Sequence, residues 1–71
     1  MNTRRKIQEA LKKFMTEGEA NACAVFWGYA MYTGKTGWHY VSFGGFATYL
    51  GKSESEALET IEQIADSRES A

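Results

Sequence analysis

The central stretch of the chain, about residues 22–50, is rich in Val, Phe, Tyr, Trp and Thr. These residue types favour β-strands. Thr33-Gly34-Lys35-Thr36 places a glycine first in a two-residue loop, as a type II′ hairpin requires, and Gly44-Gly45 suits a second tight turn. One long second strand with a glycine bulge is the alternative. We therefore expect three antiparallel strands, over about residues 22–32, 38–43 and 46–50.

An amphipathic segment precedes these strands, over about residues 3–17. Ile7, Leu11 and Phe14 fall on one face at helical spacing. Gly18 suits the end of such a helix, because glycine readily adopts the left-handed conformation found there. The pattern predicts one continuous helix before the first strand.

A second amphipathic segment follows the strands, over about residues 54–68. Ser53 is a suitable N-cap, and Glu56 completes a capping box of the form S-x-x-E. The apolar stripe of this helix consists of Ala57, Leu58, Ile61, Ile64 and Ala65. The predicted class is α+β in the order α-β-β-β-α. We expect a single small domain, residues 1–71, with both helices packed on one face of a three-stranded antiparallel meander.

The two faces of the expected sheet differ in residue type. A two-residue loop at Gly34-Lys35 would place Met31 opposite Trp38 and Tyr29 opposite Tyr40. Small residues beside phenylalanines allow close helix approach, so we assign the face that contains them to the helices. The other face would then be an exposed aromatic patch, and the reversed assignment is the alternative. The first face holds Ala24, Phe26, Gly28, Ala30, Val41, Phe43, Phe46 and Leu50; the second holds Val25, Trp27, Tyr29, Met31, Trp38, Tyr40 and Tyr49.

Charge is divided between the two ends of the chain, although the net charge is only −1. One interpretation is that the two helices neutralise each other, within the chain or across a dimer. The sharper interpretation is that one end contacts an oppositely charged partner. The basic residues of the first helix are Arg4, Arg5, Lys6, Lys12 and Lys13; the acidic residues of the last are Glu54, Glu56, Glu59, Glu62, Asp66 and Glu69.

The sequence contains few motifs typical of catalytic, phosphate-binding or metal-binding sites. Gly34-Lys35-Thr36 and Gly51-Lys52-Ser53 end like phosphate-binding loops, but neither has the required upstream glycine. His39 and Cys23 are each the only residue of their kind, whereas a zinc site needs three or four ligands. We expect a structural histidine, no catalytic residue, no metal and no cofactor.

The single cysteine, Cys23, cannot form a disulfide within the chain, which favours a cytoplasmic location. No apolar run approaches the roughly 18 residues that span a membrane, and no secretory signal follows the basic N-terminus. A domain of this size is marginally stable alone, so we expect a binding partner or self-association.

Two families share features with this chain, one with its second half and one with its overall element order. Gly37-Trp38-His39-Tyr40-Val41-Ser42-Phe43, followed by Leu50-Gly51-Lys52-Ser53-Glu54-Ser55-Glu56-Ala57-Leu58, resembles the HicB-type antitoxin domain, in which a strand pair leads to a G-x-[ST]-x-E-E-A-L helix start. The α-β-β-β-α order also resembles the double-stranded RNA-binding fold. That family places lysines at the start of its last helix, where this chain has Glu54 and Glu56. The first resemblance implies that the chain is an antitoxin. The second implies only the fold of that family and not its binding of RNA.

Three functions fit these observations. The first is a non-catalytic protein-binding module or inhibitor, such as an antitoxin or a phage anti-CRISPR protein, that docks through its aromatic face, a sheet edge or its acidic helix. Its expected contact residues are Trp27, Tyr29, Trp38, Tyr40, Tyr49, Glu59, Glu62 and Asp66. The second is a nucleic-acid-binding domain with aromatic stacking and phosphate contacts from Arg4, Arg5, Lys12 and Lys13. The third is a structural homo-oligomer, for instance a homodimer. No membrane partner is expected.

Overall fold

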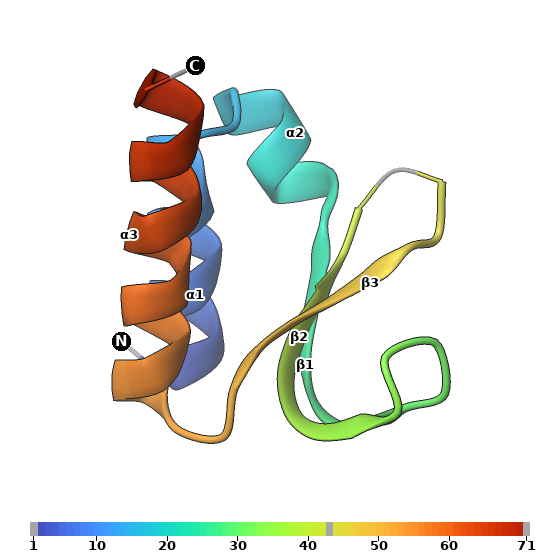
Figure 1. Cartoon of the computed structure of the whole chain (residues 1–71). Helices are drawn as coiled ribbons and strands as arrows, with labels where there is room; N and C mark the ends of the chain where they lie inside the picture. Colours follow the sequence, from blue (N-terminus) through green and yellow to red (C-terminus); the bar gives the residue numbers. More distant parts are fainter. Residues whose placement is uncertain (1, 43, 71) are drawn as a thin grey trace.

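A computed structural model describes residues 2–42 and 44–70 of the chain. The elements are α1 (Thr3–Ala10), the short 3-10 helix η1 (Leu11–Lys13), α2 (Glu17–Ala22), β1 (Ala24–Ala30), β2 (Lys35–Val41), β3 (Ala47–Gly51) and α3 (Glu54–Ser70). The strands form one antiparallel sheet in the order β1-β2-β3. Helices α1 and α3 lie side by side on one face of it (Figure 1). The predicted α+β class, element order and one-sided helix packing are confirmed.

The N-terminal helix is shorter than predicted, because a new helix begins behind Thr16. The Thr16 hydroxyl accepts a hydrogen bond from the Glu19 amide at 3.2 Å, and the Glu19 carboxylate accepts one from the Thr16 amide at 3.0 Å. This reciprocal capping box starts α2, with Gly18 inside it. A continuous helix over residues 3–17 that ends at Gly18 is therefore wrong, since the chain turns after η1.

Helix α3 begins where the capping residues predict. The Ser53 hydroxyl accepts from the Glu56 amide at 3.2 Å, and the Glu56 carboxylate accepts from the Lys52 amide at 3.3 Å. Glu54 and Glu56 occupy the first turn, where the helix dipole favours acidic side chains. The helix extends to Ser70, beyond the expected end at residue 68.

The β1–β2 hairpin has a longer loop than the expected pair Gly34-Lys35. Ala30 pairs with Lys35, so residues 31–34 form the loop. Gly34 takes a left-handed φ of 69°, and its amide donates to the Ala30 carbonyl at 2.8 Å. Trp38 thus lies opposite Trp27, not opposite Met31. This four-residue shift leaves the two sides of the hairpin unchanged, because the shift is even.

The β2–β3 pairing contains an irregularity between Trp38 and His39 that shifts the register of the third strand. His39 lies opposite Tyr49, and Tyr40 lies opposite Thr48. Tyr49, which the sequence prediction placed on the same face as Tyr40, therefore lies on the other face, and Leu50 turns toward the helices. Phe43, placed in the second strand by the sequence prediction, lies outside the described residues.

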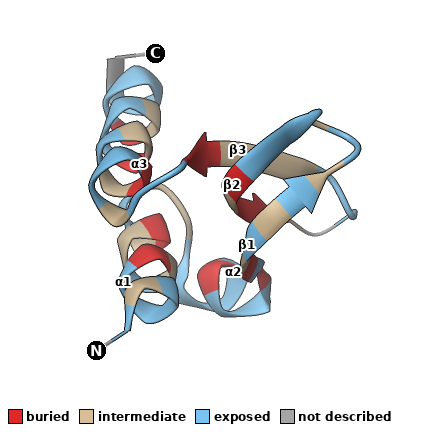
Figure 2. Cartoon of the chain, turned by 90° about the horizontal axis from the view of Figure 1, so that it is seen from below, coloured by how far each residue is buried: buried red, intermediate tan, exposed pale blue. Residues whose placement is uncertain are grey.

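The helices cover the sheet face opposite to the one predicted. We call the helix-covered side the inner face and the other side the outer face. Tyr40 and Trp38 offer the helices far more apolar area than the small residues Ala24, Gly28 and Ala30, and burial of apolar area drives this packing. Figure 2 shows the buried segments turned toward the space between helices and sheet. The core contains Ile7, Leu11, Ala20, Cys23, Val25, Tyr40, Leu50, Ala57 and Ile61.

Candidate functional site

On the outer face, His39 is the centre of a small cluster formed by the sheet and the β1–β2 loop. Its side chain is fully buried. The Phe26 ring stacks on the imidazole, with centroids 5.1 Å apart and an interplanar angle of 8°. The Tyr49 ring meets it edge-on at 5.4 Å. The expected structural histidine is thus the best-enclosed side chain of this face.

Both ring nitrogens of His39 have hydrogen-bond partners. Nδ1 lies 3.0 Å from the Gly37 carbonyl oxygen, which only accepts, so Nδ1 carries a proton. Nε2 lies 2.7 Å from Oγ1 of Thr33. The Thr33 hydroxyl also lies 3.3 Å from the Ala30 carbonyl. It can therefore donate to Nε2 of a neutral ring, or accept from an imidazolium and donate to Ala30, which leaves His39 paired in either charge state.

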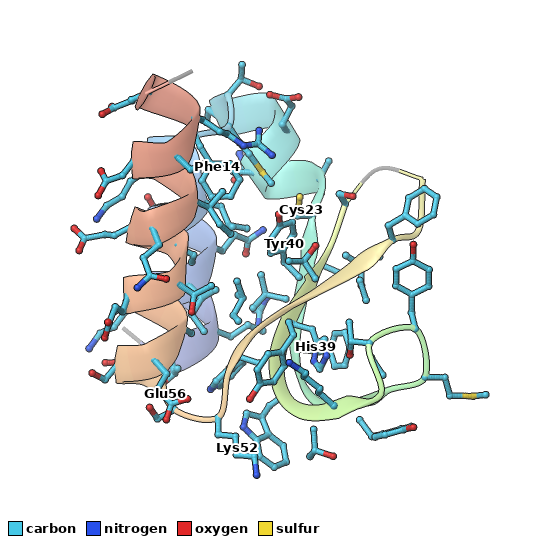
Figure 3. All side chains as sticks on the ribbon, viewed as in Figure 1. Phe14, Cys23, His39, Tyr40, Lys52 and Glu56 are labelled. Carbon is cyan, nitrogen blue, oxygen red and sulfur yellow. The ribbon has the colours of Figure 1, made fainter. Side chains whose placement is uncertain are left out.

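The Thr33–His39 bond holds the β1–β2 loop against the outer face. Figure 3 shows His39 pointing toward this loop from the strands beside it. From the same loop, the Tyr32 ring meets the Phe46 ring of the β2–β3 connection at a centroid distance of 5.5 Å. Met31, Tyr32 and Phe46 are each more than half exposed. We call these three side chains the loop patch.

The aromatic residues singled out by the sequence do not share one surface. Trp27 and Tyr29 are exposed on β1, and the Trp27 indole donates to the Lys52 carbonyl at 3.2 Å. Trp38 is half-buried against the core. Tyr40 is only 6 % exposed, so its expected place on an exposed face is wrong. Tyr49 belongs to the outer face, beside His39.

The acidic side chains Glu59, Glu62 and Asp66 lie on α3, as predicted. The Glu62 carboxylate pairs with the Lys13 ammonium at 3.0 Å. Asp66 also has an interaction partner. Lys13 stands near the N-terminal helix, so the opposite charges at the two ends of the chain meet across the helix layer.

The basic side chains of the N-terminal helices are largely paired as well. Lys6 lies 3.6 Å from Glu54, and Lys12 lies 3.1 Å from Glu9. Arg4 and Arg5 are exposed on α1. Since α1 belongs to the helix layer and the two loops lie on the far side of the sheet, the basic residues and the loop patch are separate surfaces (Figure 1).

At the other end of the molecule, a cavity of about 550 Å³ lies between α2, the end of α3 and the sheet. Phe14, Tyr40 and Arg68 line it, and the Arg68 guanidinium lies 4.8 Å from the Phe14 ring centroid. Burial raises the pKa of the Cys23 thiol, which also lines the cavity. A raised pKa makes this thiol a weak nucleophile at neutral pH. Figure 3 shows Phe14, Cys23 and Tyr40 together at this end.

Within residues 2–42 and 44–70, no group of three or more His, Cys, Asp and Glu side chains is arranged to hold a metal ion. In the same described part, no helix has the length and apolar character needed to cross a membrane. No family model, no curated protein and no solved structure matches the chain. The resemblances to HicB-type antitoxins and to the double-stranded RNA-binding fold therefore stay predictions.

Sequence reasoning missed Tyr32 as a candidate contact residue. The signal was the run Met31-Tyr32 directly before Thr33-Gly34, because large apolar residues are unusual in a hairpin loop. The predicted two-residue loop assigned both residues to the first strand. With the loop placed at residues 31–34, their exposure follows from the turn itself.

Proposed function

We propose that this chain is a non-catalytic protein-binding module that docks on another protein through its loop patch. The observation that carries this proposal is the contact between the exposed rings of Tyr32 and Phe46 on two loops, with exposed Met31 next to Tyr32 in the chain, where connections ordinarily carry polar side chains. Methionine and aromatic side chains are enriched in the cores of protein interfaces. Exposed apolar side chains are unfavourable in water, and a bound partner would shield them from it.

The geometry of the loop patch supports binding with little reorganisation. The Thr33–His39 bond holds one loop, and the contact between Tyr32 and Phe46 joins it to the other. A surface that is ordered before binding loses less conformational entropy when the complex forms. The buried histidine therefore has a role in this proposal as a positioning residue for Tyr32.

Charge next to the patch favours a particular kind of partner. Lys35 follows the β1–β2 loop, and its ammonium lies 4.9 Å from the Tyr49 ring centroid. The preferred partner is a protein with an apolar surface bordered by carboxylates. An inhibitor of the antitoxin or anti-CRISPR type is the form of this proposal in which that partner is an enzyme or effector. We place the interaction in the cytoplasm, as the single cysteine favours.

Nucleic-acid binding is the alternative, and the arrangement of charge favours it less. Stacking and phosphate contacts would need aromatic and basic side chains on one groove. Here Lys12 and Lys13 are paired with Glu9 and Glu62, in the helix layer and away from the loop patch.

Comparative capture from the source cells tests the proposal. The immobilised wild-type chain is compared with a patch variant, Tyr32→Ser with Phe46→Ser, and a helix variant, Glu59→Gln with Glu62→Gln. Circular dichroism checks that each is folded. We expect one protein to be retained by the wild type and the helix variant and lost by the patch variant. Equal retention by the patch variant, or loss only in the helix variant, would contradict the proposal. Binding that weakens steeply with salt would favour nucleic acid.

A further inference from the structure

The two edges of the sheet differ in how they are covered. Helix α3 packs against β3, and the Thr60 hydroxyl donates to the Leu50 carbonyl at 2.6 Å. The irregular pairing of β2 with β3 adds further protection at that edge. A side-chain donor and a helix thus occupy the β3 edge.

Helix α1 contacts β1, but between the two ends of this strand the described part of the chain has no side-chain donor to the backbone and no irregular pairing. Its sequence, Ala-Val-Phe-Trp-Gly-Tyr-Ala, contains no charge and no proline. Gln8 donates to the Cys23 carbonyl just before the strand, and the Thr33 hydroxyl and Gly34 amide reach the Ala30 carbonyl at its end. Between these ends, the outward-pointing backbone groups of the strand are open to another strand.

We propose that the free edge of β1 pairs antiparallel with β1 of a second copy of this chain, about a two-fold axis at Trp27. The sheet then continues from one copy into the other. An isologous contact of this kind uses the same surface on both copies and closes as a dimer. This inference rests on the strand edge and not on the loop patch, so it stands or fails separately from the proposed partner.

The side chains of β1 match themselves in this register. Trp27 lies beside the partner's Trp27, Val25 beside the partner's Tyr29, Phe26 beside the partner's Gly28, and Ala24 beside the partner's Ala30. Directly opposed aromatic and β-branched side chains are favourable cross-strand pairs. Gly28 leaves room for a neighbouring ring, since a Cβ placed there meets only the Phe26 ring of its own chain, at 3.7 Å.

The proposal also accounts for two exposed aromatic residues. Trp27 is 53 % and Tyr29 61 % exposed, both on the strand whose edge is free. Strand pairing brings Trp27 beside the partner's Trp27 and Tyr29 beside the partner's Val25, which removes apolar area from water. A chain of this size gains from such an extension, because a small domain buries a smaller share of its surface on folding than a large one.

Light scattering on the purified chain is the first test. We expect a mass of twice 8.0 kDa, falling toward 8.0 kDa on dilution. Trp27→Lys would place two ammonium groups at the axis, and we expect a folded monomer. Tyr29→Lys serves if that variant does not fold, and Tyr32→Lys is the control that stays dimeric. A wild-type monomer at every concentration, or dimers of both edge variants, would overturn the proposal.

Cysteine variants test the register. Trp27→Cys and Tyr29→Cys are each made with Cys23→Ala and oxidised. Only the residue on the axis meets its own copy, with Cβ atoms about 4.5–5.5 Å apart, whereas the two Tyr29 positions lie about 13 Å apart along the strands. We expect a covalent dimer from Trp27→Cys and little from Tyr29→Cys. Equal cross-linking of both variants, or more from Tyr29→Cys, would contradict pairing about Trp27.

Discussion

The inner and outer faces of this sheet enclose their side chains by different means. On the inner face, α1 and α3 bury Leu50 and Tyr40 among mainly apolar side chains, and the Thr60 hydroxyl donates to the Leu50 carbonyl. On the outer face, a loop encloses one polar ring, His39, which depends on hydrogen bonds at both nitrogens.

The two faces therefore have different roles: the inner face stabilises the fold, and the outer face positions the β1–β2 loop. Area buried by the helices supplies the free energy that keeps the chain folded. The hydrogen bond from Thr33 to His39 adds less, but it fixes where the loop, and with it Tyr32, is presented. We therefore expect substitutions on the two faces to differ in size and in what they disturb.

The largest effect is expected on the inner face. Leu50→Ala removes a nearly fully buried side chain from the core and leaves a cavity, which we expect to lower the free energy of unfolding by about 2–5 kcal/mol. Urea denaturation followed by circular dichroism measures this loss. A loss of unfolding free energy smaller than that caused by an outer-face substitution would contradict this expectation.

A smaller and more local effect is expected from Thr33→Val. The substitution keeps the shape of the side chain and leaves Nε2 of His39 buried without a partner, at a cost of about 1–3 kcal/mol. In a His39→Phe background, the same substitution should cost much less. A double-mutant cycle measures the coupling energy, and a value near zero would show that the pair does not hold the loop.

The smallest effect is expected at the start of α2. Thr16→Ala removes an N-cap and should cost about 0.5–2 kcal/mol.

Hydrogen bonds from Thr16 hold the pKa of Glu19 below its ordinary value. Because the folded pKa is lowered, this stabilisation is present above the ordinary glutamate pKa and is lost as the pH falls through the folded pKa. Acid titration of unfolding should show this loss in the wild type, and a Glu19→Gln variant without it is the control.

Much of the fold follows from local signals in the sequence. Strand-forming residues, turn glycines and the Ser53 capping box were enough to predict the element order. The same logic applied to Thr16 and Glu19 would have divided the N-terminal helix, but an unbroken apolar spacing through Phe14 concealed the break.

The choice of inner face did not follow from the sequence, because it depends on the total area that the helices bury. Parity correctly grouped Trp27 with Tyr40, yet a wet boundary for aromatic residues was the wrong criterion for Tyr40. The candidate site was predictable only in part: Trp27 and Tyr29 are exposed, whereas Tyr32 became visible once the loop length was known.

Nitrogen NMR of the His39 ring tests most directly whether hydrogen bonds organise the outer face. We expect a proton on Nδ1, donated to the Gly37 carbonyl, and, in the neutral ring, an Nε2 that accepts from Thr33. The Nε2 signal should change in Thr33→Val, while the core signals of Leu50 stay in place. A ring protonated only at Nε2, or one whose Nε2 signal Thr33→Val leaves unchanged, would show that these hydrogen bonds do not organise the outer face.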